Sequence, residues 1–243
     1  MMEALSPANI GLLLFGIFFV LLLIGSPIMV ALGVATMACF IVLDIDLSLM
    51  IERAFASLTA FPLMALPAFV LAGSLMEAAG VSRRLVHVAE NIVGPTPGGL
   101  AISTTLSCVF FGAISGSGVA TASAIGGITI PAMQREGYPS EFSTAIASIS
   151  SILGPIIPPS ITLIVYASIT NVSVSQLFMG SVIPGILLAG SLIVYALVYG
   201  KKNNLPAHEK QTPKQIGHAF KEGIWALLMP IIILGGIFGG IFT

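Results

Sequence analysis

Long apolar runs, separated by short polar or glycine- and proline-containing segments, dominate the hydrophobic pattern of the chain. The runs cover residues 10–25, 27–43, 61–79, 177–200 and 223–242. A helix of about 20 apolar residues crosses the hydrocarbon core of a bilayer, which is about 30 Å thick. The pattern therefore predicts a membrane-crossing helix in each of these runs.

Two segments between the runs carry charge and have a different pattern. Residues 44–60 contain Asp44, Asp46, Glu52 and Arg53, which predicts a surface helix or loop. Residues 81–96 interleave charged side chains with apolar residues at helical spacing. This alternation is typical of an amphipathic helix that lies in the membrane interface.

The stretch 97–134 has no charged residue, yet its apolar runs are short. They cover residues 100–114 and 119–133 and meet at Ser115-Gly116-Ser117-Gly118. Fifteen helical residues rise about 22 Å, which is less than the thickness of the hydrocarbon core. We expect a re-entrant helical hairpin here, and two tightly fitted full crossings are the alternative.

A second interruption follows the polar turn 135–141. The sequence Gly154-Pro155-Ile156-Ile157-Pro158-Pro159-Ser160 places three prolines within five positions. Proline lacks a backbone N–H and clashes with the preceding turn, so a continuous helix is disfavoured. The sequence predicts a discontinuous helix, with parts at 142–154 and 161–170 and an unwound centre.

Composition agrees with this pattern and excludes several classes of protein. Of the 243 residues, 56% are hydrophobic and 8% are charged, whereas about a quarter is charged in a soluble domain. The net charge of −1 gives no surface for nucleic acid. Nucleotide-binding and zinc-protease motifs are absent from the sequence. The fold class is thus an all-α polytopic membrane protein, with about six transmembrane helices, one re-entrant hairpin and one discontinuous helix.

The distribution of basic residues predicts the orientation, because cytoplasmic loops are enriched in Lys and Arg. With the lysine-rich segment 201–222 in the cytoplasm, eight of the nine basic residues lie inside. Only Arg53 then lies outside, together with the amino terminus. Counting the hairpin as a single crossing would move Arg53, Arg83 and Arg84 to the opposite sides, so charge favours the hairpin.

Both interruptions predict a buried polar site, since unwound backbone within a membrane must be surrounded by protein or water. Helical segments that end near Ser115 and Gly154 present carbonyl groups suited to a cation. Segments that start near Gly118 and Ser160 present N–H groups suited to an anion. Hydroxyl groups that can donate or accept come from Ser115, Ser117, Thr121 and Ser160.

Sodium fits this site better than a proton does. A proton relay uses an Asp, Glu or His within the membrane, and residues 54–76, 91–134 and 142–200 contain none. Glu77 is the one conceivable carrier. Both interruptions also have a structural explanation, since small residues allow close helix packing and prolines kink helices.

Several motifs make the chain resemble the large membrane (M) subunit of tripartite ATP-independent periplasmic (TRAP) transporters. They are FPLMALPAFVLAGSLMEAAG (61–80), GGLA (98–101), FGAISGSGVATASAIG (111–126), GY (137–138), LGPIIPPSI (153–161) and the segment 177–185. The resemblance implies a sodium-driven importer of organic acids, such as C4-dicarboxylates or sialic acid, in the bacterial inner membrane. It also implies a periplasmic binding protein and a small membrane (Q) subunit as partners, and an elevator mechanism.

The resemblance also implies a division of the chain. The family's large subunit consists of two inverted repeats, and this chain has about the length of one, so a carboxy-terminal half would be missing. We expect scaffold helices and a periplasmic segment at 1–60, and a membrane helix with the interfacial helix at 61–96. The hairpin follows at 97–134 and the discontinuous helix at 135–176. The remaining residues, 177–243, would form scaffold helices with the cytoplasmic loop 201–222 between them.

Carried over to this sequence, the two interruptions supply a hypothetical site with two parts. The cation part consists of Ser115, Gly116, Gly154, Pro155 and Ile157, of which Ser115, Gly116 and Gly154 would hold Na⁺ as the coupling ion. The substrate part consists of Ser117, Gly118, Thr121, Pro159 and Ser160. The resemblance implies no organic cofactor and no catalytic residue.

Other functions remain as alternatives at this point. A sodium-coupled anion carrier that needs no binding protein has the same physical requirements. An intramembrane serine hydrolase would use Ser115 or Ser117, but no predicted span contains a histidine to act as base. A pure assembly subunit would have no use for uncharged polar interruptions. We therefore expect a transporter subunit and not an enzyme.

Overall fold

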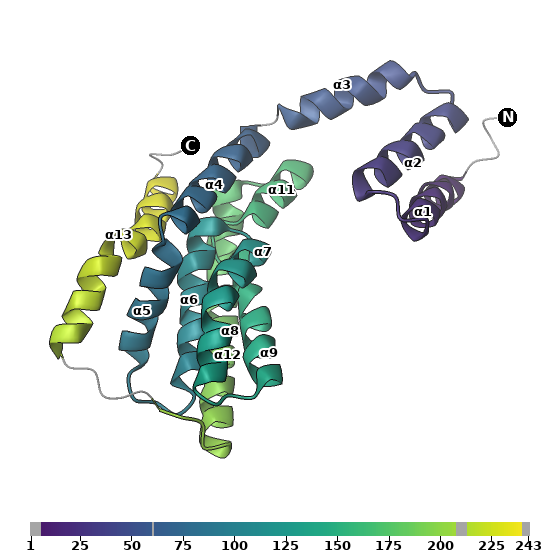
Figure 1. Cartoon of the computed structure of the whole chain (residues 1–243). Coiled ribbons are helices and arrows are strands. Elements are labelled where there is room, and N and C mark those ends of the chain that lie inside the picture. Colours follow the sequence, from purple (N-terminus) through teal and green to yellow (C-terminus); the bar gives the residue numbers. More distant parts are fainter. Residues whose placement is uncertain (1–5, 60, 208–212, 240–243) are drawn as a thin grey trace. The chain divides into compact units, whose positions relative to one another are not determined.

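The computed structural model describes residues 6–59, 61–207 and 213–239 (Figure 1). Within these ranges the regular elements are helices, and the one β feature is an isolated bridge between Pro97 and Ala207. The predicted all-α class is therefore confirmed. The chain forms two compact units, residues 1–60 and 61–243, and each is described by itself.

The first unit begins with two antiparallel apolar helices, α1 (Pro7–Leu23) and α2 (Ile28–Val42). Ser6 caps α1, since its Oγ accepts a hydrogen bond from the N–H of Asn9 at 3.4 Å. The turn between the helices uses Gly25 at a φ of +88°, a conformation that glycine adopts without steric cost.

Helix α3 (Leu47–Leu58) completes the first unit. The carboxylate of Asp46 accepts the N–H of Ser48 at 2.8 Å and so caps the helix. Ile51, Phe55 and Leu58 form an exposed apolar stripe at helical spacing. Residues 44–60 thus contain a surface helix, which was one of the two forms expected.

The second unit surrounds one buried helix, α6 (Gly99–Ser115). The other elements are α4 (Phe61–Ala78), α5 (Val81–Val93), α7 (Gly118–Thr121), the π-helical segment η2 (Ala122–Gly126), α8 (Gly127–Arg135), α9 (Ser140–Ser151), α10 (Leu153–Ile156), α11 (Ile161–Thr170), α12 (Val174–Lys202) and α13 (Pro213–Phe238). Helix α6 packs against α4, α5, α9, α10 and α12. It therefore forms the centre of this unit.

Polar side chains within the buried helix α6 are satisfied mainly by its own backbone. The hydroxyls of Ser103 and Thr104 donate to the carbonyls of Gly99 and Leu100, at 2.9 and 2.7 Å. The hydroxyl of Thr105 also lies 2.9 Å from that of Ser150 on α9. This contact joins the first arm of the hairpin to the discontinuous helix.

Helical parts lie on either side of both interruptions, but the second interruption is shorter than predicted, because α10 continues the helix past residue 154 to Ile156. The first arm of the hairpin is α6, and the second arm runs through α7, η2 and α8 to Arg135. The two parts of the discontinuous helix, Ser140–Ile156 and Ile161–Thr170, meet at an angle of 42°. We call residues 116–117 the first break and residues 157–160 the second break.

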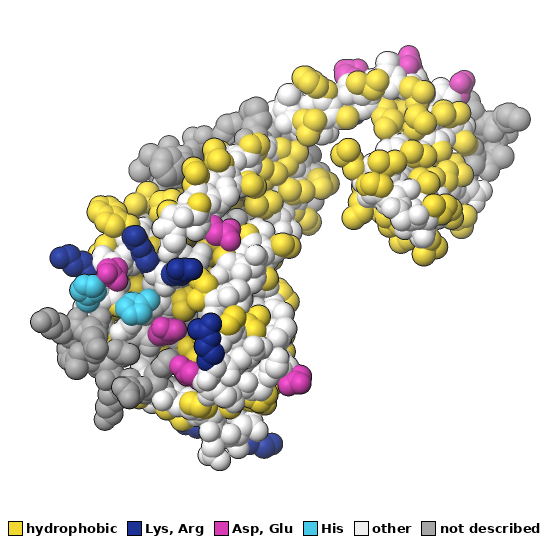
Figure 2. All heavy atoms as spheres, viewed as in Figure 1, with side chains coloured by type: hydrophobic (Ala, Val, Ile, Leu, Met, Phe, Trp, Pro, Cys, Tyr) yellow, Lys and Arg dark blue, Asp and Glu magenta, His cyan; other side chains and the backbone are white. Residues whose placement is uncertain are grey.

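Helix α5 has the predicted amphipathic pattern, but its apolar face contacts protein. Leu85, Val86, Val88 and Ala89 are buried, and α5 packs against α6 and α13. Charged and histidine side chains gather over α5 and the first part of α13 (Figure 2). The placement of this helix in the membrane interface stays a prediction.

The predicted polar loop 201–222 is shorter in the structure than the sequence suggested. Helix α12 continues to Lys202 and α13 already begins at Pro213, while residues 208–212 lie outside the described part. In the early turns of α13 Ala219 is buried, and Gly223 lies close to Val88 of α5, so this polar part of the helix packs on protein. Hydropathy alone identifies only the apolar remainder of this helix.

Two helices in the described ranges have the length and composition to cross a membrane. They are Val174–Lys202 and the part Ile216–Gly236 of α13, and the bent pair around the second break would make a third. Helices α1, α2 and α6 are apolar but have 17, 15 and 17 residues. The count of about six transmembrane helices stays a prediction.

Candidate functional site

The first break reverses the chain between α6 and α7. Gly116 ends α6 at a φ of +60°, and Ser117 is extended and caps the second arm by accepting the N–H of Ala120 at 3.3 Å. The hydroxyl of Thr121 donates to the carbonyl of Ser117 at 2.7 Å and lies 3.3 Å from the hydroxyl of Ser115. Three hydroxyl groups are thus gathered at one helix end and one helix start.

The second break repeats this arrangement in a different sequence. Ile157 is extended, and Ser160 caps α11 by accepting the N–H of Leu163 at 3.3 Å. The hydroxyl of Ser160 donates to the carbonyl of Pro155 at 2.6 Å. Ser117 and Ser160 have nearly the same backbone angles, with φ of −126° in both and ψ of 124° and 129°. Each break therefore ends in a serine-capped helix start.

The two breaks lie in direct contact with each other. The carbonyl of Gly116 accepts a hydrogen bond from the N–H of Ile161 at 3.3 Å. A Cβ added to Gly116 would lie 2.7 Å from the carbonyl oxygen of Pro159. Main chain therefore packs on main chain at this point, and only glycine fits.

Gly154 of α10 forms a second contact, with the first break and the start of the second arm. A Cβ on this residue would lie 2.8 Å from both the carbonyl oxygen of Ser117 and Oγ1 of Thr121. The ring of Pro155 packs on Gly118, where an added Cβ would lie 3.3 Å from the proline Cδ. The α10 turn is thus fitted into the start of the hairpin's second arm.

The structure brings nine of the ten predicted site residues together around this contact. Ser115, Thr121 and Ser160 are buried, with 5%, 0% and 0% of their surface exposed. Pro159 is buried as well, while Ser117, Gly118 and Pro155 are half-buried. The side chain of Ile157 instead packs beside Gly185 of α12 and joins the apolar cluster of Leu153, Ala189 and Leu192, so only its backbone faces the break.

Two glycines of this site are absent from the predicted set. A Cβ on Gly112 of α6 would lie 2.8 Å from the Cα of Gly154, and one on Gly73 of α4 would lie 3.6 Å from the Cα of Ser115. Gly112 stands four residues before Gly116, and this small-xxx-small spacing is the signal for close packing that the sequence offers.

The chemistry of the site is that of neutral oxygen and amide groups. The hydroxyls of Ser115, Ser117, Thr121 and Ser160 contact one another or backbone groups, so none has a histidine or carboxylate base. No group of three or more His, Cys, Asp or Glu side chains that could hold a metal occurs within the described ranges. A small cation would therefore be held by carbonyl and hydroxyl oxygens, and an anion by N–H and hydroxyl groups.

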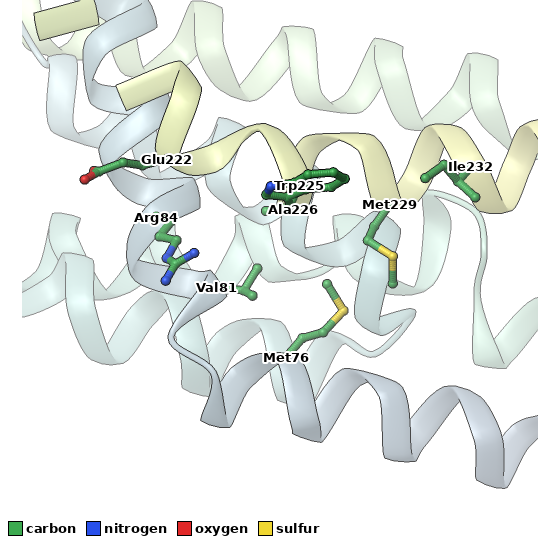
Figure 3. Close-up of a pocket in the computed structure, with 8 residues that line it drawn as sticks. All are labelled: Met76, Val81, Arg84, Glu222, Trp225, Ala226, Met229 and Ile232. Atoms are coloured by element: carbon green, nitrogen blue, oxygen red, sulfur yellow. The ribbon is translucent and has the colours of Figure 1, made fainter. Parts of the chain in front are cut away.

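A separate cavity of about 320 Å³ lies between α4, α5 and α13, away from the two breaks. Its walls include Met76, Val81, Trp225 and Met229, and Arg84 and Glu222 stand at one end (Figure 3). None of the predicted site residues lines it.

Comparison with known proteins identifies relatives over nearly the whole chain. The family model "Tripartite ATP-independent periplasmic transporter, DctM component" matches residues 15–243. The isethionate TRAP transporter permease protein DctMQ of Oleidesulfovibrio alaskensis is 43% identical over 95% of this chain and 36% of the relative.

Two further relatives are similar over the same region. The C4-dicarboxylate TRAP transporter large permease protein DctM of Vibrio cholerae is 40% identical over 95% of the chain and 51% of the relative. The sialic acid TRAP transporter permease protein SiaT of Haemophilus influenzae is 34% identical over 93% of the chain and 37% of the relative. All three are named as permeases and not as enzymes, as the sequence led us to expect. The chain spans between 36% and 51% of their lengths.

Proposed function

Because the chain belongs to the DctM component family of tripartite ATP-independent periplasmic transporters, we propose that it forms part of the permease of a sodium-coupled importer of organic acids. The names of the three relatives refer to isethionate, C4-dicarboxylates and sialic acid, all of which are organic anions. A periplasmic binding protein would deliver the substrate. The name DctMQ joins two subunit designations, which favours a small membrane subunit as a further partner.

The contact between the two breaks is the observation that supports this proposal most strongly. It assembles helix ends and helix starts in a region without charged side chains, where partial charges of the backbone act on ions with little competition. The carbonyl oxygen of Gly116 accepts one hydrogen bond, from the N–H of Ile161. A carbonyl oxygen has a second lone pair, which can coordinate a cation. Main-chain oxygens would then bind the cation.

The division of the site follows from these groups. Carbonyls around Ser115, Gly116 and Gly154 would coordinate Na⁺, with the backbone of Pro155 and Ile157 beside them. The hydroxyls of Ser117, Thr121 and Ser160 and the amides at the two helix starts, next to Gly118 and Pro159, would bind the substrate carboxylate. The hydroxyl of Ser160 must rotate away from Pro155 to do so.

A full binding site would need a second set of breaks. The chain spans about half the length of the Vibrio cholerae relative and a smaller share of the other two. We therefore expect the carboxy-terminal half of a complete permease to supply a matching hairpin and discontinuous helix. In an elevator mechanism the two joined breaks would move with the substrate as one body.

A sodium-coupled anion carrier without a binding protein is the second candidate, since the neutral site suits either. A serine hydrolase is disfavoured by the structure, because Ser115 hydrogen bonds with Thr121 and Ser117 and a nucleophile needs a base.

Uptake of labelled organic acids tests the proposal. Proteoliposomes would contain this chain, a complementary carboxy-terminal half and the small subunit, and uptake would be measured with and without Na⁺ and binding protein. We expect uptake to require both additions. Uptake that needs Na⁺ alone would support the second candidate, and uptake that is independent of Na⁺ would refute sodium coupling.

Two serine-to-alanine variants distinguish a role in the site from a general effect on the fold. Ser117→Ala should raise the Na⁺ concentration or the substrate concentration needed for half-maximal uptake. Ser191→Ala is the matched control, since Ser191 is exposed on α12 and its hydroxyl only donates to the carbonyl of Leu188. Equal kinetics in the two variants would contradict a role of Ser117 in the site.

A further inference from the structure

The cavity between α4, α5 and α13 has one charged end and one apolar end. Arg84 and Glu222 stand at the charged end, and Met229 and Ile232 lie further along α13 with Met76 of α4 facing them (Figure 3). A cavity of about 320 Å³ with this polarity matches an amphiphilic molecule. It does not match a small polar solute, for which the apolar end offers no partner.

The two charges at the cavity are available to a ligand. The side chain of Arg84 is exposed and has no ion pair among the described residues. Glu222 lies 3.6 Å from His218, and both of these side chains are more than half exposed. Arg84 and Glu222 form no salt bridge with each other within 4 Å in the part of the chain that the structure describes. One positive and one negative group thus stand at the same end of the cavity without pairing with each other.

The position of the cavity along α13 places the charged end toward the membrane surface. The part of this helix with the length and composition to cross a membrane is Ile216–Gly236, so Glu222 lies nearer its start and Ile232 nearer its end. Trp225 lies between them with 74% of its surface exposed. Tryptophan prefers the headgroup level of a bilayer, and a long Arg side chain reaches from an apolar surface to that level.

We propose that this cavity binds a glycerophospholipid whose headgroup carries an ammonium group, of the phosphatidylethanolamine type. The phosphate pairs with Arg84, the ammonium with Glu222, and an acyl chain lies along Met76, Met229 and Ile232. A headgroup with negative charge alone would meet Glu222 unfavourably. This inference does not depend on the transport proposed above, because it concerns a different surface.

The chain contains one tryptophan, Trp225, which makes the cavity observable by fluorescence. The purified full chain in detergent would be titrated with phosphatidylethanolamine carrying brominated acyl chains, which quench tryptophan on contact. Phosphatidylglycerol with the same brominated chains is the comparison. We expect saturable quenching by both lipids, with half-quenching at a lower concentration of phosphatidylethanolamine.

Charge variants test the assignment of the headgroup. An exposed charge pair changes affinity by about two- to fivefold, so Arg84→Gln should raise the half-quenching concentration of both lipids by that factor. Glu222→Gln should remove the preference for phosphatidylethanolamine. Arg83→Gln is the matched control, because Arg83 is exposed on the same helix and does not line the cavity.

Three results would overturn the proposal. The first is quenching by phosphatidylglycerol at concentrations equal to or lower than those of phosphatidylethanolamine in the unaltered chain. The second is an Arg84→Gln variant that behaves like the Arg83→Gln control. The third is displacement of both lipids alike by the small membrane subunit, without any headgroup preference, which would assign the cavity to a protein partner.

Discussion

The backbone contact between Gly112 and Gly154 should be highly sensitive to a single methyl group. A Cβ on Gly112 would lie 2.8 Å from the Cα and 3.1 Å from the amide nitrogen of Gly154. Real Cβ atoms almost never approach other heavy atoms below 3.0 Å, and the obstructing atoms here belong to the backbone. Gly112→Ala therefore requires α6 and α10 to move apart.

The expected loss of stability follows from overpacking. Extra methyl groups in a closely packed region cost about 1–3 kcal/mol, and the higher helix propensity of alanine returns up to about 1 kcal/mol. Gly112→Ala should therefore be about 1–3 kcal/mol less stable than an alanine variant at a helical glycine without such an overlap. Gly190→Ala on α12 is the control, since no heavy atom lies within 4 Å of its added Cβ, and it should be neutral or stabilising.

Unfolding in detergent, followed by the fluorescence of Trp225 or by circular dichroism, measures both variants. Gly154→Ala should be destabilising as well, because its Cβ would lie 2.8 Å from both the carbonyl oxygen of Ser117 and Oγ1 of Thr121. If Gly112→Ala is as stable as Gly190→Ala, the close contact between α6 and α10 is wrong.

Three further predictions concern other contacts of the second unit. Thr105→Val leaves the buried hydroxyl of Ser150 without its hydrogen-bond partner at 2.9 Å and should lower the unfolding free energy by about 1–3 kcal/mol. The double variant Thr105→Val/Ser150→Ala should lower it by less. Equal losses in the single and double variants would contradict the hydrogen bond. Gly200→Ala should lower the melting temperature more than Gly180→Ala, because its Cβ would lie 2.6 Å from the carbonyl oxygen of Pro97 whereas that of Gly180 meets nothing within 4 Å. Burial raises the pKa of Tyr138 to about 12. A hydrogen bond with the backbone of Leu100 lowers this pKa, and the charge of Glu136 raises it by a smaller amount. Folding thus favours the neutral phenol, so the contribution of Tyr138 to folding stability is complete below pH 10 and is lost as the pH rises toward 12. Ultraviolet titration should show a late tyrosinate step that Tyr138→Phe removes. An unchanged titration of this variant would refute the assignment.

The positions of both breaks follow from the sequence because their causes are local. Ser115 to Gly118 interrupts two short apolar runs, and the prolines at 155, 158 and 159 cannot continue a helix. The serine caps are equally local, since Ser117 and Ser160 each precede a helical run. Such features need no knowledge of the rest of the chain.

Contacts between distant segments could not be derived in the same way. The small-xxx-small spacing at Gly112 predicts close packing, but the sequence around it does not identify Gly154 as the residue that it contacts. The apolar face of α5 has the same pattern whether lipid or protein covers it, and the structure covers it with α6 and α13. The start of α13 is hidden because polar residues are compatible with both a loop and a helix.

The hydrogen bond between Gly116 and Ile161 has a mechanical consequence. Since main chain rests on main chain at this junction, neither break has a side chain whose rotation would let it swing open while the other stays in place. A gate within this half would have to break backbone contacts, and sliding of the whole bundle would not. Under the proposed transport function, control over which side of the membrane a ligand reaches would then come from the surroundings, at surfaces such as that of Val119, which is 83% exposed beside the first break.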